Sequence, residues 1–222
     1  MAVIILIFFV KEVAVKKFAN TTNMFSNIRR VIKSNRPFVI LLLIAGMFNL
    51  GAYNFSFVLL RASDLGVQKD FIPIVFAIIN VAHTVSGIPS GMLADRIGKE
   101  KVLILGYSVF AISSVFMIVL TGNFIYAYII ASVFGLYIGI SETVQRAVVP
   151  RYVSSELRGT AFGVYNLVLG ISFFVSNIIF GHLWDIYNLN IAILYSLVLA
   201  STSIIAMFIF IKKYPISKTQ VS

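Results

Sequence analysis

Long apolar runs, separated by short polar and charged stretches, make up most of the chain. A helix needs about 20 residues to cross a hydrocarbon core, and six of the runs are long enough. They are continuous rather than alternating, which favours transmembrane helices over the strands of a barrel. The sequence therefore predicts an all-α, polytopic membrane protein. Its six transmembrane helices are Phe38–Leu60, Phe71–Leu93, Val102–Leu120, Phe124–Val149, Thr160–Gly181 and Ile191–Ile211.

The residues outside these six helices fall into three parts. Residues 1–10 are apolar but too short to span a bilayer, and they lack the basic start and the cleavage site of a signal peptide. We interpret them as the cytoplasmic end of a truncated transmembrane helix. Residues 11–36 are basic and polar, as expected of a cytoplasmic loop that touches anionic lipid headgroups. The six-helix domain occupies residues 37–212, and residues 213–222 form a cytoplasmic tail.

Lysine and arginine are unequally divided between the two sides of the predicted bundle. Of 18 such residues, 16 fall on the side of the termini, and only Arg61 and Lys69 fall on the other side. Because cytoplasmic loops carry the excess of cations, we predict that both termini are cytoplasmic, in the plasma membrane. The formal net charge of +10 comes from loops between apolar runs, so we expect no nucleic-acid partner.

Residue usage argues against several kinds of chemistry. The 222 residues include no cysteine, so there is no disulfide framework and no thiolate metal site. The two histidines are 99 residues apart and make no obvious metal pair, and no phosphate-binding loop motif occurs. No nucleophile, base and orienting group fall together in the sequence. We therefore expect no enzyme activity, no cofactor and no metal site.

Polar side chains within the apolar runs gather on four of the six predicted helices. Because polar groups in hydrocarbon are costly, they should face the bundle interior or a wet cavity. The third and sixth predicted helices carry no Asn, Gln, His or charged residue in their apolar parts, so we expect these two helices to face lipid. The candidate pathway residues are Asn49, Asn54, Asn80, His83, Asn166 and Asn177.

Three of these features have more than one interpretation. Small and polar residues recur with a seven-residue period on the fifth helix, and this stripe serves either close helix packing or a sliding or pathway surface. His83 is either a hydrogen-bonded packing residue or a group that contacts solute or carries a proton. Glu142 precedes Arg146 by one turn, which suits an ion pair at a gate; the alternative for Glu142 is a protonatable coupling site. The stripe consists of Gly159, Gly163, Asn166, Gly170, Asn177 and Gly181.

Two connecting segments carry a family resemblance. Gly91–Lys101 reads Gly-Met-Leu-Ala-Asp-Arg-Ile-Gly-Lys-Glu-Lys and closely resembles the signature loop of the major facilitator superfamily (MFS) of secondary transporters. Arg158-Gly-Thr-Ala-Phe-Gly163 resembles the loop between the tenth and eleventh helices of that family. The resemblance covers most of Phe38–Ile211. Members have twelve helices in two halves, so the chain resembles the C-terminal six-helix half.

The resemblance implies a secondary transporter that moves a small solute by alternating access. The cavity of such a transporter forms between two halves. We therefore expect the lipid bilayer and a second six-helix half, either a separate chain or a second copy, as partners besides the solute. The alternative is a non-transporting membrane fragment or partner subunit. The resemblance also places the signature loop at a cytoplasmic gate, with Gly91, Asp95, Arg96, Gly98, Lys99 and Lys101 as its residues.

An internal repeat fits the same family. Gly91-Met-Leu-Ala-Asp95 ends the second predicted helix, and Gly181-His-Leu-Trp-Asp185 ends the fifth. The two copies are three helices apart and therefore face opposite sides of the membrane, and only the inward copy is followed by cations. Inverted repeats of three plus three helices are a known feature of this superfamily. We interpret the six helices as such a 3+3 repeat.

Overall fold

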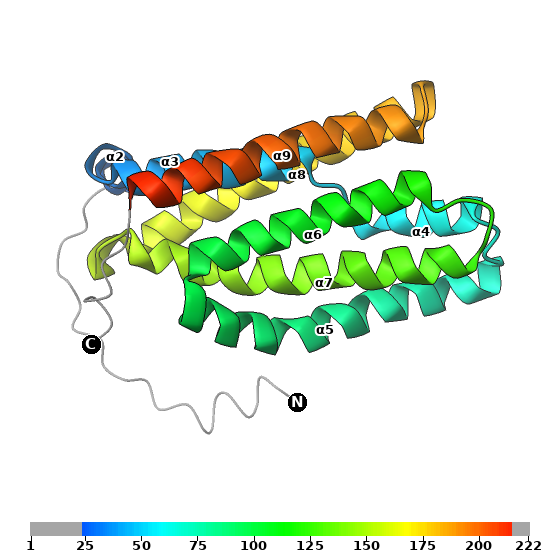
Figure 1. Ribbon diagram of the computed structural model, residues 1–222. Helices are drawn as coiled ribbons and strands as arrows, with labels where there is room; N and C mark the ends of the chain where they lie inside the picture. The colour runs from blue at the N-terminus through cyan, green and yellow to red at the C-terminus, as the bar shows by residue number, and fades with distance from the viewer. Residues whose placement is uncertain (1–23, 215–222) are drawn as a thin grey trace, which may run out of the picture.

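A computed structural model describes residues 24–214 as a bundle of long helices that run alongside one another (Figure 1). Six helical segments are long and apolar enough to cross a bilayer, and residues 24–214 contain no strand. The prediction of an all-α, polytopic membrane protein is confirmed. The 3+3 inverted repeat stays a prediction. The expected truncated helix at residues 1–10 and residues 11–23 of the basic loop lie outside the described residues.

Each predicted span has a counterpart within a few residues, because charged residues and glycines mark the ends of the apolar runs. One helix was not predicted: α2 lies inside the stretch 11–36, which we expected to be a loop, and it packs against α8. The helices are α2 (Met24–Ser34), α3 (Arg36–Gly51), α4 (Phe55–Asp64), α5 (Ile72–Ile97), α6 (Lys99–Val119), α7 (Ile125–Val148), α8 (Arg158–Ile186) and α9 (Leu189–Lys213), with single 3₁₀ turns η1 (Lys69–Phe71), η2 (Val149–Arg151) and η3 (Ser155–Leu157).

The first span is two helices rather than the single helix we predicted over Phe38–Leu60. α3 ends at Gly51, and α4 begins at Phe55 after an extended connection. α3 packs against α8 and α9, whereas α4 packs against α5 and α7 (Figure 1). The break is therefore the point where the first span changes its neighbours. At the end of α3, Gly51 allows a close approach to α9, because a Cβ there would lie only 2.6 Å from the Cβ of Leu199 on α9.

The tightest helix crossing is between α5 and α7. A Cβ at Gly135 would lie 2.7 Å from the Cβ of Ala82 and would overlap the carbonyl oxygen of Ile79. A Cβ at Gly139 would overlap the carbonyl oxygen of His83. Two glycines four residues apart on α7 thus let its backbone approach that of α5, as small residues do in membrane helix pairs. The sequence analysis overlooked this pair.

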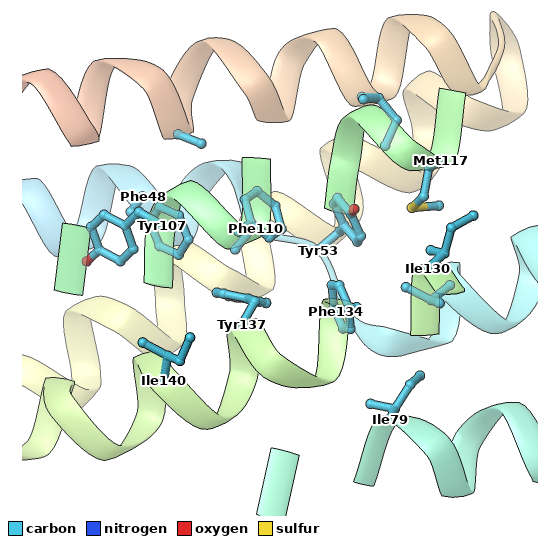
Figure 2. Packing of buried hydrophobic residues seen from close by; sticks show 14 of the residues in the cluster. Phe48, Tyr53, Ile79, Tyr107, Phe110, Met117, Ile130, Phe134, Tyr137 and Ile140 are labelled. Atoms are coloured by element: carbon cyan, nitrogen blue, oxygen red, sulfur yellow. The ribbon is translucent and has the colours of Figure 1, made fainter. Parts of the chain in front are cut away.

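Aromatic rings fill the centre of the bundle beside the break (Figure 2). The rings of Phe48 and Tyr107 stack with centroids 3.6 Å apart, and Phe110 lies 4.9 Å from Tyr137. Tyr53, in the connection between α3 and α4, is fully buried among these rings, and its hydroxyl is hydrogen-bonded to the hydroxyl of Ser114 at 3.1 Å. The broken segment is therefore anchored in the core by a large buried side chain.

The expectation that the third and sixth helices face lipid stays a prediction, but α6 also has a buried side. Half of the most apolar 18-residue window of α6 is buried within the chain, against 17% for α5 and for α8. α6 lies between α7 and α9 and buries Tyr107, Phe110 and Ser114. The Ser114 hydroxyl donates to the carbonyl of Phe110 in the same helix, so a helix can be central without carrying an amide or a charge.

Candidate functional site

A cavity of about 450 Å³ is bounded by α3, α4, α7 and α8. Its wall combines aromatic rings with amide, carboxylate and guanidinium groups. Polar groups at such a depth are costly unless they face water or one another, so this concentration marks the cavity as the candidate site. The lining residues are Asn49, Tyr53, Asn54, Phe55, Phe134, Tyr137, Ile138, Ser141, Glu142, Gln145, Arg146, Tyr165, Asn166, Leu169, Gly170 and Phe173.

The structure brings together several of the candidate residues that the sequence suggested. Asn49, Asn54 and Asn166 all line the cavity, although they come from different segments of the chain. Asn177 lines a second hollow of about 460 Å³, which adjoins the first because both include Asn54. Asn80 lines neither hollow; it is exposed on α5, and its side-chain amide donates to a carbonyl of the preceding turn.

Hydrogen bonds from α8 and α9 hold the break in the first span. The backbone N–H of Asn54 donates to Oδ1 of Asn177 at 2.9 Å, and the hydroxyl of Tyr195 donates to the carbonyl of Leu50. Asn54 itself caps α4, since its Oδ1 accepts from the backbone N–H of Ser56 at 2.9 Å. Backbone groups that the break removes from helical hydrogen bonding are thereby paired. Asn177, expected as a pathway residue, is thus also a cap across helices.

Glu142 meets His83 on the neighbouring helix. Oε2 of Glu142 lies 3.7 Å from Nε2 of His83, and the two side chains are 53% and 36% exposed. The glycine-mediated approach of α5 and α7 brings the two side chains together. The ion pair expected between Glu142 and Arg146 is not formed in residues 24–214: Arg146 has no carboxylate within 4.0 Å, and its side chain is exposed at the wall of the cavity.

The signature loop is shorter than we expected. We predicted that the second helix ends at Leu93 and the third begins at Val102, but α5 continues to Ile97, and Gly98 alone separates it from α6. The φ of Gly98 is +100°, a conformation that favours glycine. Asp95 therefore lies in the last turn of α5, where it is exposed and has no hydrogen bond or ion pair among the described residues.

The loop also contains a buried carboxylate that the sequence analysis overlooked. Glu100 is 7% exposed; it accepts hydrogen bonds from Nη1 of Arg151 at 3.1 Å and from the hydroxyl of Tyr152 at 2.9 Å. Burial and the adjacent carboxylate raise the pKa of the Tyr152 hydroxyl, so it remains a donor. The helical spacing of Glu100 with Leu103 and Tyr107, both fully buried, is the signal that could have identified it.

The stripe on α8 has no packing role within the described chain for three of its glycines. A Cβ at Gly159, Gly163 or Gly170 would meet nothing within 4 Å, whereas one at Gly181 would lie 3.4 Å from the ring of Phe57. The exposed side chains of Leu167 and Phe174 extend the same open surface. These three glycines therefore make no close helix contact within residues 24–214, and both interpretations of the stripe stay predictions.

Comparison with known proteins places the chain in a family. The sequence profile described as Major Facilitator Superfamily matches residues 38–222. An uncharacterized MFS-type transporter of Methanocaldococcus jannaschii is 33% identical over 172 residues, which are 73% of this chain and 42% of the relative. Uncharacterized proteins of Mycobacterium bovis and Mycobacterium tuberculosis are 30% identical over 117 residues, which are 52% of this chain and 27% of each relative.

The chain spans less than half the length of these curated relatives. The profile match nevertheless includes all six apolar helical segments, the signature loop and the residues that line the cavity. The chain therefore belongs to the Major Facilitator Superfamily.

Proposed function

We propose that this chain supplies six helices of an MFS secondary transporter and that the cavity beside the broken first span is its part of the solute pathway. Membership of the superfamily points to a transporter rather than an enzyme, in a multi-pass membrane protein. The observation that carries the proposal is the cavity itself. It brings Asn49 of α3, Glu142 of α7 and Asn166 of α8 to one cavity among apolar spans, where a polar solute or water makes such groups less costly.

We propose a gating role for Asp95. It is exposed at the end of α5 and unpaired within the described chain. A carboxylate in this position can bind the positive end of a helix or an arginine of another bundle. Breaking that contact when the pathway opens would couple the signature loop to alternating access. Gly98 supports the role because it fixes a one-residue connection, so that Asp95 is carried rigidly by α5.

We propose that a second six-helix half covers α5 and α8. These two helices are the least buried spans, and a Cβ added at Gly159, Gly163 or Gly170 of the α8 stripe would meet nothing within 4 Å in residues 24–214. Asn80 and Asn166 are exposed on them. Each polar group left against lipid costs about 1 kcal/mol, which a partner surface would recover. The partner is either a cognate N-terminal half or a second copy, and the exposed Asp95, which has no complementary site here, favours the cognate half.

The orientation of the chain is also proposed. The signature loop and both termini then lie in the cytoplasm, and the protein lies in the plasma membrane; the 16 cations on the side of that loop support this orientation. In this orientation the Glu100–Arg151 contact lies at the cytoplasmic end of the bundle. Arg61 and Lys69 are then the two external cations.

Uptake by reconstituted vesicles tests the proposal. The chain is co-expressed with a candidate second half, and accumulation of a panel of radiolabelled small solutes is measured with and without a proton gradient. We expect saturable uptake that Asp95→Asn slows while the protein inserts normally. Asp185→Asn, which removes an exposed carboxylate from the far end of α8, is the matched control and should transport normally. Absence of uptake with every solute and partner would favour the alternative, a non-transporting membrane subunit.

A further inference from the structure

Aromatic rings dominate one part of the cavity. Six of its sixteen lining residues are aromatic, namely Tyr53, Phe55, Phe134, Tyr137, Tyr165 and Phe173. Tyr53 stacks on Phe134 with ring centroids 5.5 Å apart, and Phe134 meets Tyr137 edge-on at 5.5 Å (Figure 2). Three of the rings are therefore held in fixed positions by one another. Such a wall suits a flat apolar group, and the negative faces of the rings favour a nearby positive charge.

Along α7, the carboxylate of Glu142 comes before the guanidinium of Arg146 when counted from the aromatic rings. Tyr137, Glu142 and Arg146 all line the cavity from the same helix. At a rise of 1.5 Å per residue, Glu142 lies about 7.5 Å beyond Tyr137 along the helix, and Arg146 about 6 Å further. The first charged group beyond the rings is therefore a carboxylate, and the guanidinium comes one turn later.

Glu142 retains capacity to bind a cation. Only its Oε2 approaches His83, at 3.7 Å, which is too long for a hydrogen bond, and the side chain is 53% exposed. Among residues 24–214 no donor forms a hydrogen bond with either carboxylate oxygen of Glu142, and Arg146 has no carboxylate within 4.0 Å. The other titratable groups facing this part of the wall are the hydroxyls of Tyr137 and Tyr165. The carboxylate is thus the free anionic group of the cavity.

We infer that this cavity binds solutes in which an ammonium group is joined by a short chain to an aromatic ring. The inference rests on the proposed function and names the class of its solute. The ring lies against Tyr137 and the half-buried rings of Phe55 and Phe173, and the ammonium binds Glu142. An aryl carboxylate of the same length would bring its anion to Glu142 before reaching Arg146, and a neutral analogue would leave the carboxylate without a counter-charge.

Calorimetric titration of the purified chain in detergent tests this without requiring transport. The probes are 2-phenylethylamine, 2-phenylethanol and 3-phenylpropionate at pH 7, which share a ring and differ in charge. We expect the amine to bind at least tenfold more tightly than the alcohol and the carboxylate to bind most weakly. Glu142→Gln should remove the tenfold preference and leave binding of the alcohol unchanged. Glu156→Gln removes the same charge from exposed η3, outside the cavity, and should keep the preference.

A second variant keeps the test decisive if Glu142→Gln does not fold, as checked by gel filtration and thermal unfolding. Arg146→Gln removes the neighbouring cation and should tighten amine binding at least threefold. Equal binding of the probes, preference for the carboxylate, preference that survives Glu142→Gln, or no binding of any probe would each overturn the inference. Saturable uptake of another solute would leave the proposed function intact. Amine binding without uptake of any solute would leave this inference intact and remove the proposed function.

Discussion

Replacing Asn177 with alanine removes the acceptor that α8 provides to the broken first span. In the structure the N–H of Asn54 donates to Oδ1 of Asn177 at 2.9 Å, across 123 residues of sequence. The N–H has no helical partner because it lies between α3 and α4. Asn177→Ala therefore leaves a backbone donor unpaired beside an apolar core. We expect the variant to insert normally and to be less stable, with the connection between α3 and α4 loosened.

The magnitude follows from the environment of the bond. Leaving a buried donor unpaired costs about 1–3 kcal/mol in soluble proteins, and interhelical side-chain bonds measured in a membrane protein average about 0.6 with a maximum of about 1.7 kcal/mol. Asn177 is half-buried at the wall of a hollow, where water can replace part of the bond. We therefore expect Asn177→Ala to lower the free energy of unfolding by about 1 kcal/mol.

Unfolding in mixed detergent micelles measures this loss, and Trp184 provides the signal. It is the single tryptophan of the chain, and its ring lies 5.9 Å from that of Phe180, which stacks on Tyr53 of the broken segment. Asn166→Ala is the matched control, because Asn166 is an exposed amide on the same helix with no hydrogen bond to the described chain.

A double-mutant cycle isolates the bond itself. Asn54→Pro removes the donor, and the φ of −76° at this position is compatible with proline. Its own cost includes loss of the cap on α4, which the cycle subtracts. We expect a coupling energy of about 0.6–1.7 kcal/mol between Asn54→Pro and Asn177→Ala. A coupling below about 0.3 kcal/mol, or equal losses from Asn177→Ala and Asn166→Ala, would refute the assignment of Asn177 as the cap.

Three further predictions test other parts of the structure. Gly139→Ala should lower thermal stability by about 1–3 kcal/mol, because its Cβ overlaps a backbone carbonyl of α5. Gly163→Ala should leave thermal stability unchanged, because the new Cβ would meet nothing within 4 Å. Equal losses of stability from Gly139→Ala and Gly163→Ala would contradict the packing of α7 against α5. Glu100→Gln should cost about 1–3 kcal/mol in chemical unfolding by weakening a buried charged hydrogen bond, and a neutral effect would contradict this. In a chain with no native cysteine, Ser63→Cys should react with an impermeant thiol reagent from outside and Ser155→Cys should not; the reverse pattern would reject the proposed orientation.

Hydropathy was sufficient to predict the six spans because a lipid-exposed backbone has few alternatives to a helix. It could not predict the break in the first span. The connection Ala52-Tyr53-Asn54 continues the apolar run apart from one amide, so the average hydropathy does not change there. Its polarity suggested Asn54 as a pathway residue, but asparagine is also a frequent helix N-cap. The cap interpretation would have predicted the start of α4 correctly.

Contacts between helices could not be predicted from one sequence. His83 and Glu142 are 59 residues apart, and Glu100 and Arg151 are 51 residues apart, so each pair depends on which helices are neighbours and at what register. Local spacing instead suggested Glu142 with Arg146, which share a helix. The same limit applies to the glycines. The regular spacing on α8 predicted a functional or packing stripe there, whereas the two glycines that allow the close contact between α5 and α7 lie on α7.

The two sets of glycines differ in whether other helices of the described chain pack against them. Gly135 and Gly139 bring α7 against α5 so closely that a methyl group would overlap the backbone, and close-packed contacts of this kind have few alternative arrangements. They hold Glu142 beside His83 on a rigid frame. A Cβ at Gly159, Gly163 or Gly170 of α8 would meet nothing within 4 Å, and Leu167 and Phe174 project from the same uncovered surface. Under the proposed rocking of one six-helix half against another, this surface would move against the partner while the α5–α7 contact stays fixed. We therefore expect substitutions at the α7 glycines to impair folding, and bulky substitutions on the α8 stripe to impair uptake in a folded protein.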